Sequence, residues 1–209
     1  MTKLIMIGAG GHSKSVADAI QKDKYELCGF LDENKTGTHM GLPIYGRKIE
    51  DIPNYKDYVY FVSIGDVDFR KAWYERVKSY ELQVVNIIDR TAIIAGTAKI
   101  GEGNFIGKLA IINADAIIGN NNVINTKALI EHECVVGNHT HLSTNSTING
   151  NVEVQDSVFL GSTAVCNGQL KIGKHAVIGS GSVIIHDVEP YTTVVGVPGR
   201  VIKRSKPNE

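Results

Sequence analysis

The sequence has no net charge and no long apolar run, and both absences exclude classes of protein. Lysine plus arginine equal aspartate plus glutamate at 22 each, so no overall electric field attracts nucleic acid or an anionic membrane. No segment approaches about 18 uninterrupted apolar residues, and the N-terminus "MTKLIMIGAGG" enters a strand pattern without the apolar core of a signal peptide. We therefore expect no nucleic-acid partner and no membrane insertion.

Cysteine is also scarce. Cys28, Cys134 and Cys166 are odd in number, widely spaced and set among apolar residues. A disulfide framework needs paired cysteines, so this pattern favours reduced thiols. Together with the lack of a targeting segment, it predicts a cytoplasmic protein.

The first predicted domain, residues 1–86, alternates strand-like and helix-like segments. The segments "KLIMIG", "YELCGFLDE" and "YVYFVSIGD" are typical of strands, whereas "SVADAIQKD" and "DFRKAWYERVKSY" are typical of helices. This alternation predicts a Rossmann-like α/β domain, built from βαβ units around a small parallel sheet.

The second predicted domain, residues 87–209, follows a period of six. At every sixth position from Ile94 to Ile184, 15 of 16 residues are aliphatic and the other is Cys166. A helix repeats every 3.6 residues and a flat strand every two, so each hexad must form one short strand and a turn, as in a parallel β-helix. Glycine or asparagine often follows the aliphatic residue, and we expect positive φ angles there.

The segment "IEHECVVGNHTHLS", residues 130–143, is rich in histidine and raises the question of a metal site. Histidine, cysteine and glutamate all bind zinc. However, the hexad register places Cys134 inside the β-helix, and Val136 stands where an H-E-x-x-H motif needs its second histidine. We therefore predict no metal here, and we interpret His139 as a solvated turn residue.

The loop "GAGGHSKSV", Gly8 to Val16, joins the first strand to the first helix, where backbone N–H groups bind phosphate. Asp32 and Glu33 end the second strand, where doubly wound folds contact a ribose. Gly65 and Asp66 close the third strand and complete the expected pocket. Ser13 replaces the third glycine of a dinucleotide fingerprint, and no second half-sheet follows, so a mononucleotide fits better than NAD.

The register also separates two histidines. Residues 18 apart stack in a coil of three hexads, which places small residues above and below His132: Ala114, Gly150 and Gly168. His132 and His141 are nine residues apart, or half a coil, so they face opposite sides of one β-helix. If both serve one reaction, a second chain must supply one of them, and a closed ring of three chains is the simplest symmetry.

Five motifs occur in an order that resembles the PglD/NeuD family of bacterial sugar acetyltransferases, and the resemblance covers essentially the whole chain. They are "GxGGHxK", "FLDE", "IGD", "EHEC" and "VVGVPGRVIKR". The resemblance implies a left-handed parallel β-helix of hexapeptide repeats. It also implies a homotrimer with acetyl-CoA bound between subunits and a nucleotide-linked amino sugar bound to the α/β domain.

The resemblance assigns roles to particular residues. His132 would be the general base, and Glu133 would raise its basicity. The coenzyme would contact His141, Ser162 and Ser180. The residues expected to bind the nucleotide sugar are Gly10, Gly11, His12, Asp32, Glu33 and Gly65.

Our leading hypothesis is acetyl-CoA-dependent N-acetylation of a nucleotide-linked sugar, with a UDP-4-amino sugar as the first candidate, for surface glycan synthesis. An alternative keeps the fold and transfers the acetyl group to oxygen, as on a sialic acid. Two further alternatives are a regulatory hexapeptide protein that only assembles and a nicotinamide-dependent oxidoreductase. Neutral imidazole suits either acyl transfer, because its pKa lies near the pH at which enzymes operate.

Overall fold

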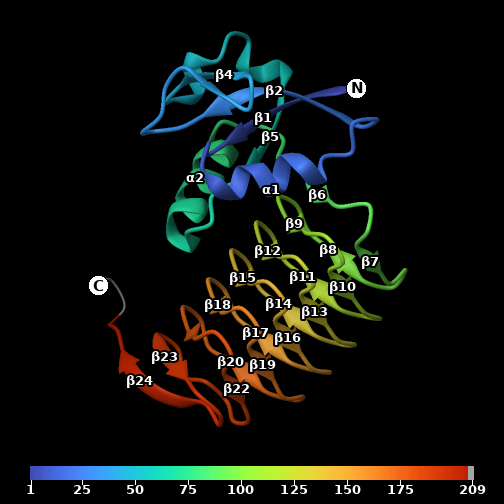
Figure 1. Ribbon diagram of the computed structural model, residues 1–209, viewed down its shortest axis with the longest axis vertical. Helices are drawn as coiled ribbons and strands as arrows, with labels where there is room; N and C mark the ends of the chain where they lie inside the picture. The colour runs from blue at the N-terminus through green and yellow to red at the C-terminus, as the bar shows by residue number, and fades with distance from the viewer. Residues whose placement is uncertain (207–209) are drawn as a thin grey trace.

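The computed structural model describes residues 1–206 and consists of an α/β domain above one end of a β-helix (Figure 1). The predicted architecture is therefore confirmed. The last three residues of the second predicted domain, 207–209, lie outside the described residues. No helix among the described residues is long and apolar enough to span a bilayer.

The α/β domain contains a five-stranded sheet in the order β3-β4-β2-β1-β5. Strands β1, β2, β4 and β5 are parallel, and β3 and β4 form an antiparallel hairpin. The elements are β1 (Thr2–Ile7), α1 (Gly11–Ala19), β2 (Tyr25–Leu31), β3 (Thr38–His39), β4 (Leu42–Gly46), η1 (Ile49–Asp51), η2 (Tyr55–Asp57), β5 (Val59–Val62) and α2 (Val67–Ser79).

Helices cover both faces of this sheet. Side chains alternate between the faces of a strand, and those of β1 are buried on both. Leu4 and Met6 pack in one cluster with Val16 of α1. Ile5 and Ile7 pack in another cluster with α2. This double burial explains why β1 is a continuous apolar run rather than an alternating one.

The β-helix consists of two-residue strands that recur every six residues without an inserted loop. They are β6 (Ile87–Ile88), β7 (Ile93–Ile94), β8 (Lys99–Ile100), β9 (Phe105–Ile106), β10 (Ile111–Ile112), β11 (Ile117–Ile118), β12 (Val123–Ile124), β13 (Leu129–Ile130), β14 (Val135–Val136), β15 (His141–Leu142), β16 (Thr147–Ile148), β17 (Glu153–Val154), β18 (Phe159–Leu160), β19 (Val165–Cys166), β20 (Lys171–Ile172), β21 (Val177–Ile178) and β22 (Val183–Ile184). Two longer strands, β23 (Thr192–Val195) and β24 (Arg200–Arg204), end the fold as an antiparallel pair.

From β6 to β22 the strands form three parallel sheets, the sides of the β-helix, and paired residues are 18 apart, as predicted. The first sheet runs from β7 to β22, the second from β8 to β20, and the third begins at β6 and ends with β24. The interior is filled by the aliphatic residues of the period and by small residues such as Ala110. Cys134 and Cys166 belong to this core, and burial raises the pKa of the Cys166 thiol to about 12.

The turns differ from the sequence-based expectation. Positive φ angles do not occur at the glycine or asparagine that follows each aliphatic residue, but two positions later, at residues such as Glu133 (φ 58°) and His139 (φ 60°). The glycines serve close approach instead. A Cβ on Gly101 would lie 2.7 Å from the backbone oxygen of Gly119, and one on Gly161 would lie 2.5 Å from the next coil. Glycine is present because the coils stack too closely for a side chain.

The junction between the two domains is built around Arg70 of α2. Its side chain is 1% exposed, and its guanidinium donates five hydrogen bonds to backbone oxygens of both domains, at 2.8 to 3.3 Å. The acceptors are Ile64, Gly65, Asn121, His139 and Thr140. Burial lowers the pKa of Arg70 to about 10, so the group stays charged near neutral pH. The guanidinium therefore fixes the end of β5 against two successive coils.

Candidate active site

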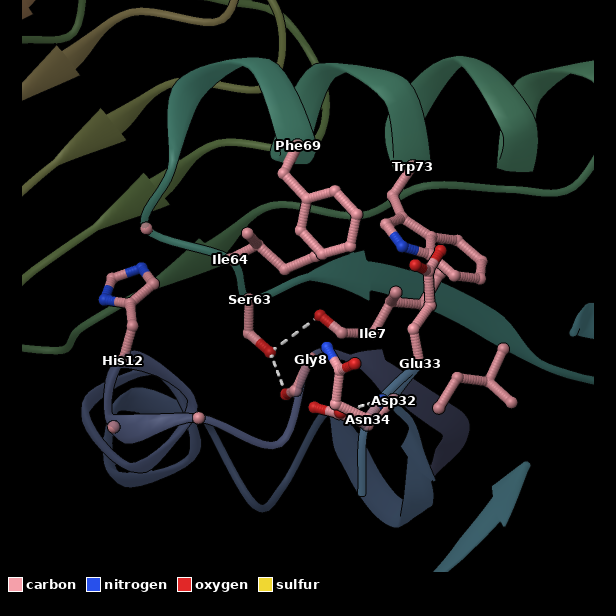
Figure 2. Close-up of a pocket in the computed structure, with 14 residues that line it drawn as sticks. Ile7, Gly8, His12, Asp32, Glu33, Asn34, Ser63, Ile64, Phe69 and Trp73 are labelled. Atoms are coloured by element: carbon pink, nitrogen blue, oxygen red, sulfur yellow. Dashed lines mark hydrogen bonds between the residues drawn. The ribbon is translucent and has the colours of Figure 1, made fainter. Parts of the chain in front are cut away.

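A pocket of about 380 Å³ opens at the carboxyl ends of β1, β2 and β5. Figure 2 shows Phe69 and Trp73 of α2 above it, Asp32 and Asn34 on the opposite side, and Glu33 extending toward Trp73. The carboxyl ends of parallel strands meet at one edge of a sheet, and ligands bind there in open α/β folds. All six residues predicted to bind the nucleotide sugar line this pocket, namely Gly10, Gly11, His12, Asp32, Glu33 and Gly65.

The carboxylates of Asp32 and Glu33 differ in how many hydrogen bonds they accept from the protein. Asp32 accepts backbone N–H hydrogen bonds from Ala9, Asn34 and Lys35 at 2.7 to 2.9 Å. Partial burial raises the pKa of the Asp32 carboxyl, but these hydrogen bonds outweigh burial and the pKa falls below its usual value. Glu33 has one distant partner, Arg76 at 3.4 Å. Asp32 thus holds the pocket wall together, whereas the Glu33 carboxylate is more available to a ligand.

Residues that follow β5 and residues of α2 also shape the pocket, and the sequence pattern does not show most of them. Ser63 lines the pocket, and its hydroxyl donates to the backbone oxygens of Ile7 and Gly8 at 3.0 and 2.7 Å (Figure 2). Trp73 and Phe69 were treated only as parts of a helix. Asp66 does not line the pocket; its carboxylate caps α2 by accepting from the Phe69 N–H at 2.8 Å.

His12 extends from α1 at one end of the pocket (Figure 2). Its ring lies edge-on to Phe105, with centroids 5.3 Å apart, and 6.3 Å from the ring of His141. The Nε2 atom is buried and has no hydrogen-bond partner among the described residues. Burial, assisted by the charge of Arg70, lowers the pKa of His12 to about 4, so its imidazole is neutral near pH 7.

His141 lies beneath this pocket on β15 and is 8% exposed. Its Nδ1 is 3.1 Å from the backbone oxygen of Gly65. Because a carbonyl oxygen only accepts, we assign the ring proton to Nδ1, which leaves Nε2 as an acceptor. Burial, followed by the charge of Arg70, lowers the pKa of His141 to about 4. The β-helix thus presents a neutral imidazole with a fixed tautomer.

The His132–Glu133 pair lies at the turn between β13 and β14, where the first two sheets meet. The third sheet, which carries His141, forms the remaining side of the β-helix. The two histidines therefore face different sides, as the register predicts. The His132 Nδ1 is 3.1 Å from the Glu133 Oε2, and the two side chains are 59% and 63% exposed.

Two predicted coenzyme contacts lie on adjacent coils. Ser162 follows β18 and Ser180 follows β21, and the backbone oxygen of Ser162 accepts from Gly181 at 2.9 Å. Both serines are at least partly accessible. They follow the sheet that carries His141 and lie away from His132.

The interpretation of His139 as a solvated turn residue is wrong. Its backbone is in a turn, but its side chain is buried at the domain junction, 5.5 Å from the ring of Tyr74. Its Nδ1 is 2.8 Å from the side-chain nitrogen of Asn121. The sequence shows the turn but not the helix α2 that covers it. Within residues 1–206, no cluster of three or more histidine, cysteine or acidic side chains could hold a metal ion.

The family comparisons match both parts of the chain. Residues 3–77 match the model of the PglD N-terminal domain. Residues 97–132 match the bacterial transferase hexapeptide model of six repeats. An uncharacterized protein, L142 of Acanthamoeba polyphaga mimivirus, is 36% identical over 101 residues, which are 48% of this chain and only 20% of that protein.

Solved structures resemble the chain over nearly its full length. PerB from Caulobacter crescentus, in complex with CoA and GDP-perosamine, is 27% identical with a TM-score of 0.90, over 97% of this chain and 98% of the other. The acetyltransferase domain of PglB from Neisseria gonorrhoeae is 27% identical with a TM-score of 0.92, over 97% and 100% of the two chains. That domain has also been solved with acetyl coenzyme A.

Proposed function

We propose that this chain, which matches the PglD N-terminal domain and the bacterial transferase hexapeptide repeats and resembles PerB and PglB, transfers an acetyl group from acetyl-CoA to the amino group of a nucleotide-linked sugar. The observation that carries the proposal is the single pocket lined by all six residues expected to hold such a sugar. We assign residues 1–86 to acceptor binding and residues 87–209 to acyl transfer. Three reduced thiols suit action in the cytoplasm.

The start of α1 supports binding of the diphosphate. Gly10 is the N-cap of this helix and no side chain caps it, so its first N–H groups are open to a ligand. Helix N-termini attract phosphate through these donors and the helix dipole. Gly11 begins the helix, and His12 Nε2 lacks a partner within the described chain. If that nitrogen carries the ring proton it could donate to a phosphate oxygen, and if it does not it could accept from a sugar hydroxyl.

His132 is the proposed general base. As the sugar amine attacks the thioester carbon, the nitrogen forms a bond and must lose a proton, while the carbon–sulfur bond breaks and releases CoA. Neutral imidazole takes that proton, and the Glu133 carboxylate, 3.1 Å from Nδ1, stabilises the imidazolium that results. The thiol leaves as CoA-SH once it receives a proton.

The coenzyme is proposed to lie along the third sheet. Since His141 Nε2 can only accept, it suits an amide N–H of the pantetheine arm rather than the thioester oxygen. Ser162 and Ser180 extend the same surface. A second chain must supply His132 to this surface, because the two histidines face different sides of one β-helix. We therefore propose a homotrimer with each active site between subunits.

Acceptor identity is tested with acetyl-CoA and a panel of UDP-, GDP- and dTDP-linked 4-amino sugars, with sialic acid as an oxygen acceptor. A UDP-linked amino sugar is our first candidate, and a GDP-linked one is the second because PerB is solved with GDP-perosamine. Release of free thiol measures turnover. Transfer to sialic acid alone would replace N-acetylation with O-acetylation.

The role of His132 is tested by His132→Ala. Turnover should fall by about 10² to 10⁴-fold, the usual contribution of a general base, with little change in acetyl-CoA binding. A variant within threefold of the normal rate would contradict this role. Sedimentation that shows a fully active monomer would contradict the intersubunit site.

A further inference from the structure

Gly150 occupies a turn position that does not require glycine. The column of residues that stack at 18-residue spacing through His132 contains Gly96, Ala114, Gly150 and Gly168. Ala114 shows that this position accepts a side chain. Positive φ angles fall on the residue that follows this position at Asp115, Glu133, Asn151 and Gln169, and Gly150 itself does not have one. The backbone alone therefore does not explain glycine at position 150.

The side chain of His132 does explain it. A Cβ on Gly150 would lie 2.6 Å from both Cε1 and Nε2 of the His132 ring, and 3.3 Å from Cδ2. Ordinary contact to a Cβ is 3.4 to 4 Å, so the imidazole occupies the space of the missing methyl group. By contrast, a Cβ on Gly96, at the first turn of this column, would meet nothing within 4 Å.

This contact matters because His132 has little other support. Its side chain is 59% exposed, and within residues 1–206 the ring has one hydrogen-bond partner, Glu133, at Nδ1. Exposed side chains with one partner ordinarily sample several rotamers. Gly150 allows the ring to lie against the next coil on the Nε2 side while Glu133 is near Nδ1. Two contacts then define the direction of Nε2.

We propose that Gly150 is a positioning residue for His132: the absence of a side chain seats the imidazole against the following coil and aims Nε2 at the acceptor amine. The inference rests on the proposed role of His132 as general base. It gives Gly150 a role beyond that of a small residue stacked on His132, namely to hold the histidine itself.

The expected consequence is a loss of turnover without loss of binding. A methyl group at position 150 would displace the ring by about 1 Å, and misplacement of that size costs about 10 to 10²-fold in rate. The displaced group is the free end of an exposed side chain, so the fold should be retained. KM values for acetyl-CoA and for the amino sugar should change less than about twofold, because His132 is proposed to act on the proton rather than in binding.

The test compares Gly150→Ala with the matched control Gly96→Ala, each in the wild-type chain and in the His132→Ala chain. The acceptor is the amino sugar of the panel that is turned over fastest. Gly150→Ala should lower kcat about 10 to 10²-fold in the wild-type chain and have no further effect when His132 is absent, whereas Gly96→Ala should be silent in both. Equal losses in both chains, or a normal kcat, would overturn the inference. Gly150→Ser carries the same Cβ and replaces Gly150→Ala if that variant does not fold.

A second readout does not depend on activity. In protein labelled with ¹³C at the histidine Cε1, the His132 signal is identified by its absence in His132→Ala. It should shift in Gly150→Ala and remain unchanged in Gly96→Ala. An unchanged signal in Gly150→Ala would overturn the inference even if the acceptor differs from the panel. A shifted signal together with a fully active His132→Ala enzyme would instead contradict the proposed role of His132 in catalysis. The contact between Gly150 and the His132 ring would still stand.

Discussion

The two domains place their functional residues by different means. In the α/β domain the pocket residues come from four separate stretches, near residues 8–12, 32–34, 63–65 and 69–73, and only the folded sheet brings them together. In the β-helix each residue's side is set by its place in an 18-residue coil, so His132 and His141 can be assigned to different sides by counting. Repeats make local position predictable, whereas a doubly wound sheet depends on long-range packing.

The largest effect is expected where the two domains meet. Arg70→Met should destabilise the junction by about 3 to 5 kcal/mol, because it leaves five backbone oxygens, those of Asn121, His139 and Thr140 in buried hydrogen bonds, without their charged donor. Urea unfolding followed by tryptophan fluorescence should show the α/β domain, which contains Trp73, unfolding before the β-helix. Lys71→Met, at a partly exposed position of the same helix, is the control. Coincident unfolding at the wild-type midpoint would mean that the domains do not depend on Arg70.

A second prediction concerns acid. Burial lowers the pKa of His141 from 6.5 to about 4, so the unfolded chain binds more protons than the folded chain between these values, and stability falls as pH drops through that window. Each unit of pKa difference corresponds to about 1.4 kcal/mol, which gives about 3 kcal/mol for this residue. His141→Gln keeps a donor for the Gly65 oxygen but cannot be protonated.

The measurement is the free energy of unfolding between pH 4 and 7. His141→Gln should reduce the loss of stability below pH 6.5, while His186→Gln, at an exposed position, should leave it unchanged. If His141→Gln and the parent protein lost stability in parallel, another group would control the acid transition.

A smaller effect is expected at His139, whose burial depends on α2. His139→Asn should cost about 1 to 3 kcal/mol, because it removes packing against Tyr74 while asparagine tolerates the positive φ. Lys127→Asn, at an equivalent but exposed turn (φ 58°), should be neutral. Thermal unfolding of both variants checks this. If His139→Asn and Lys127→Asn had the same melting temperature, the packing of His139 against α2 would not stabilise the protein.

The smallest effect is expected from a substitution in the β-helix, away from the domain junction. Glu133→Gln should lower turnover by about 10-fold or less, since it removes the charge beside the imidazole but leaves the ring in place. Stability should not change, because the side chain is 63% exposed. Glu131→Gln is the control, since its carboxylate meets the His132 backbone N–H at 3.3 Å and not the ring. If Glu131→Gln lost more turnover than Glu133→Gln, then Glu131 rather than Glu133 would be the residue that supports the imidazole.

Much of the fold was readable from local pattern. The alternation of strands and helices predicted the α/β domain, and the six-residue period predicted the β-helix and the inward position of Cys134. Turn geometry was predicted less well, because glycine suggested a positive φ where the cause is close stacking of coils. The φ angle follows from the backbone path through three dimensions, whereas the space available to a Cβ depends on the neighbouring coil.

The sequence by itself determined the period of the β-helix, and hence that His132 and His141 face different sides, because an 18-residue coil assigns a side to every position. It also determined that a glycine-rich turn and two acidic residues end successive strands of a parallel sheet. Only the tertiary structure decided that α2 buries Arg70 and His139, that Gly65 fixes the tautomer of His141, and that Gly150 seats the ring of His132. These features arise from contacts between segments distant in sequence, and no local pattern encodes which side chain will fill the space between them.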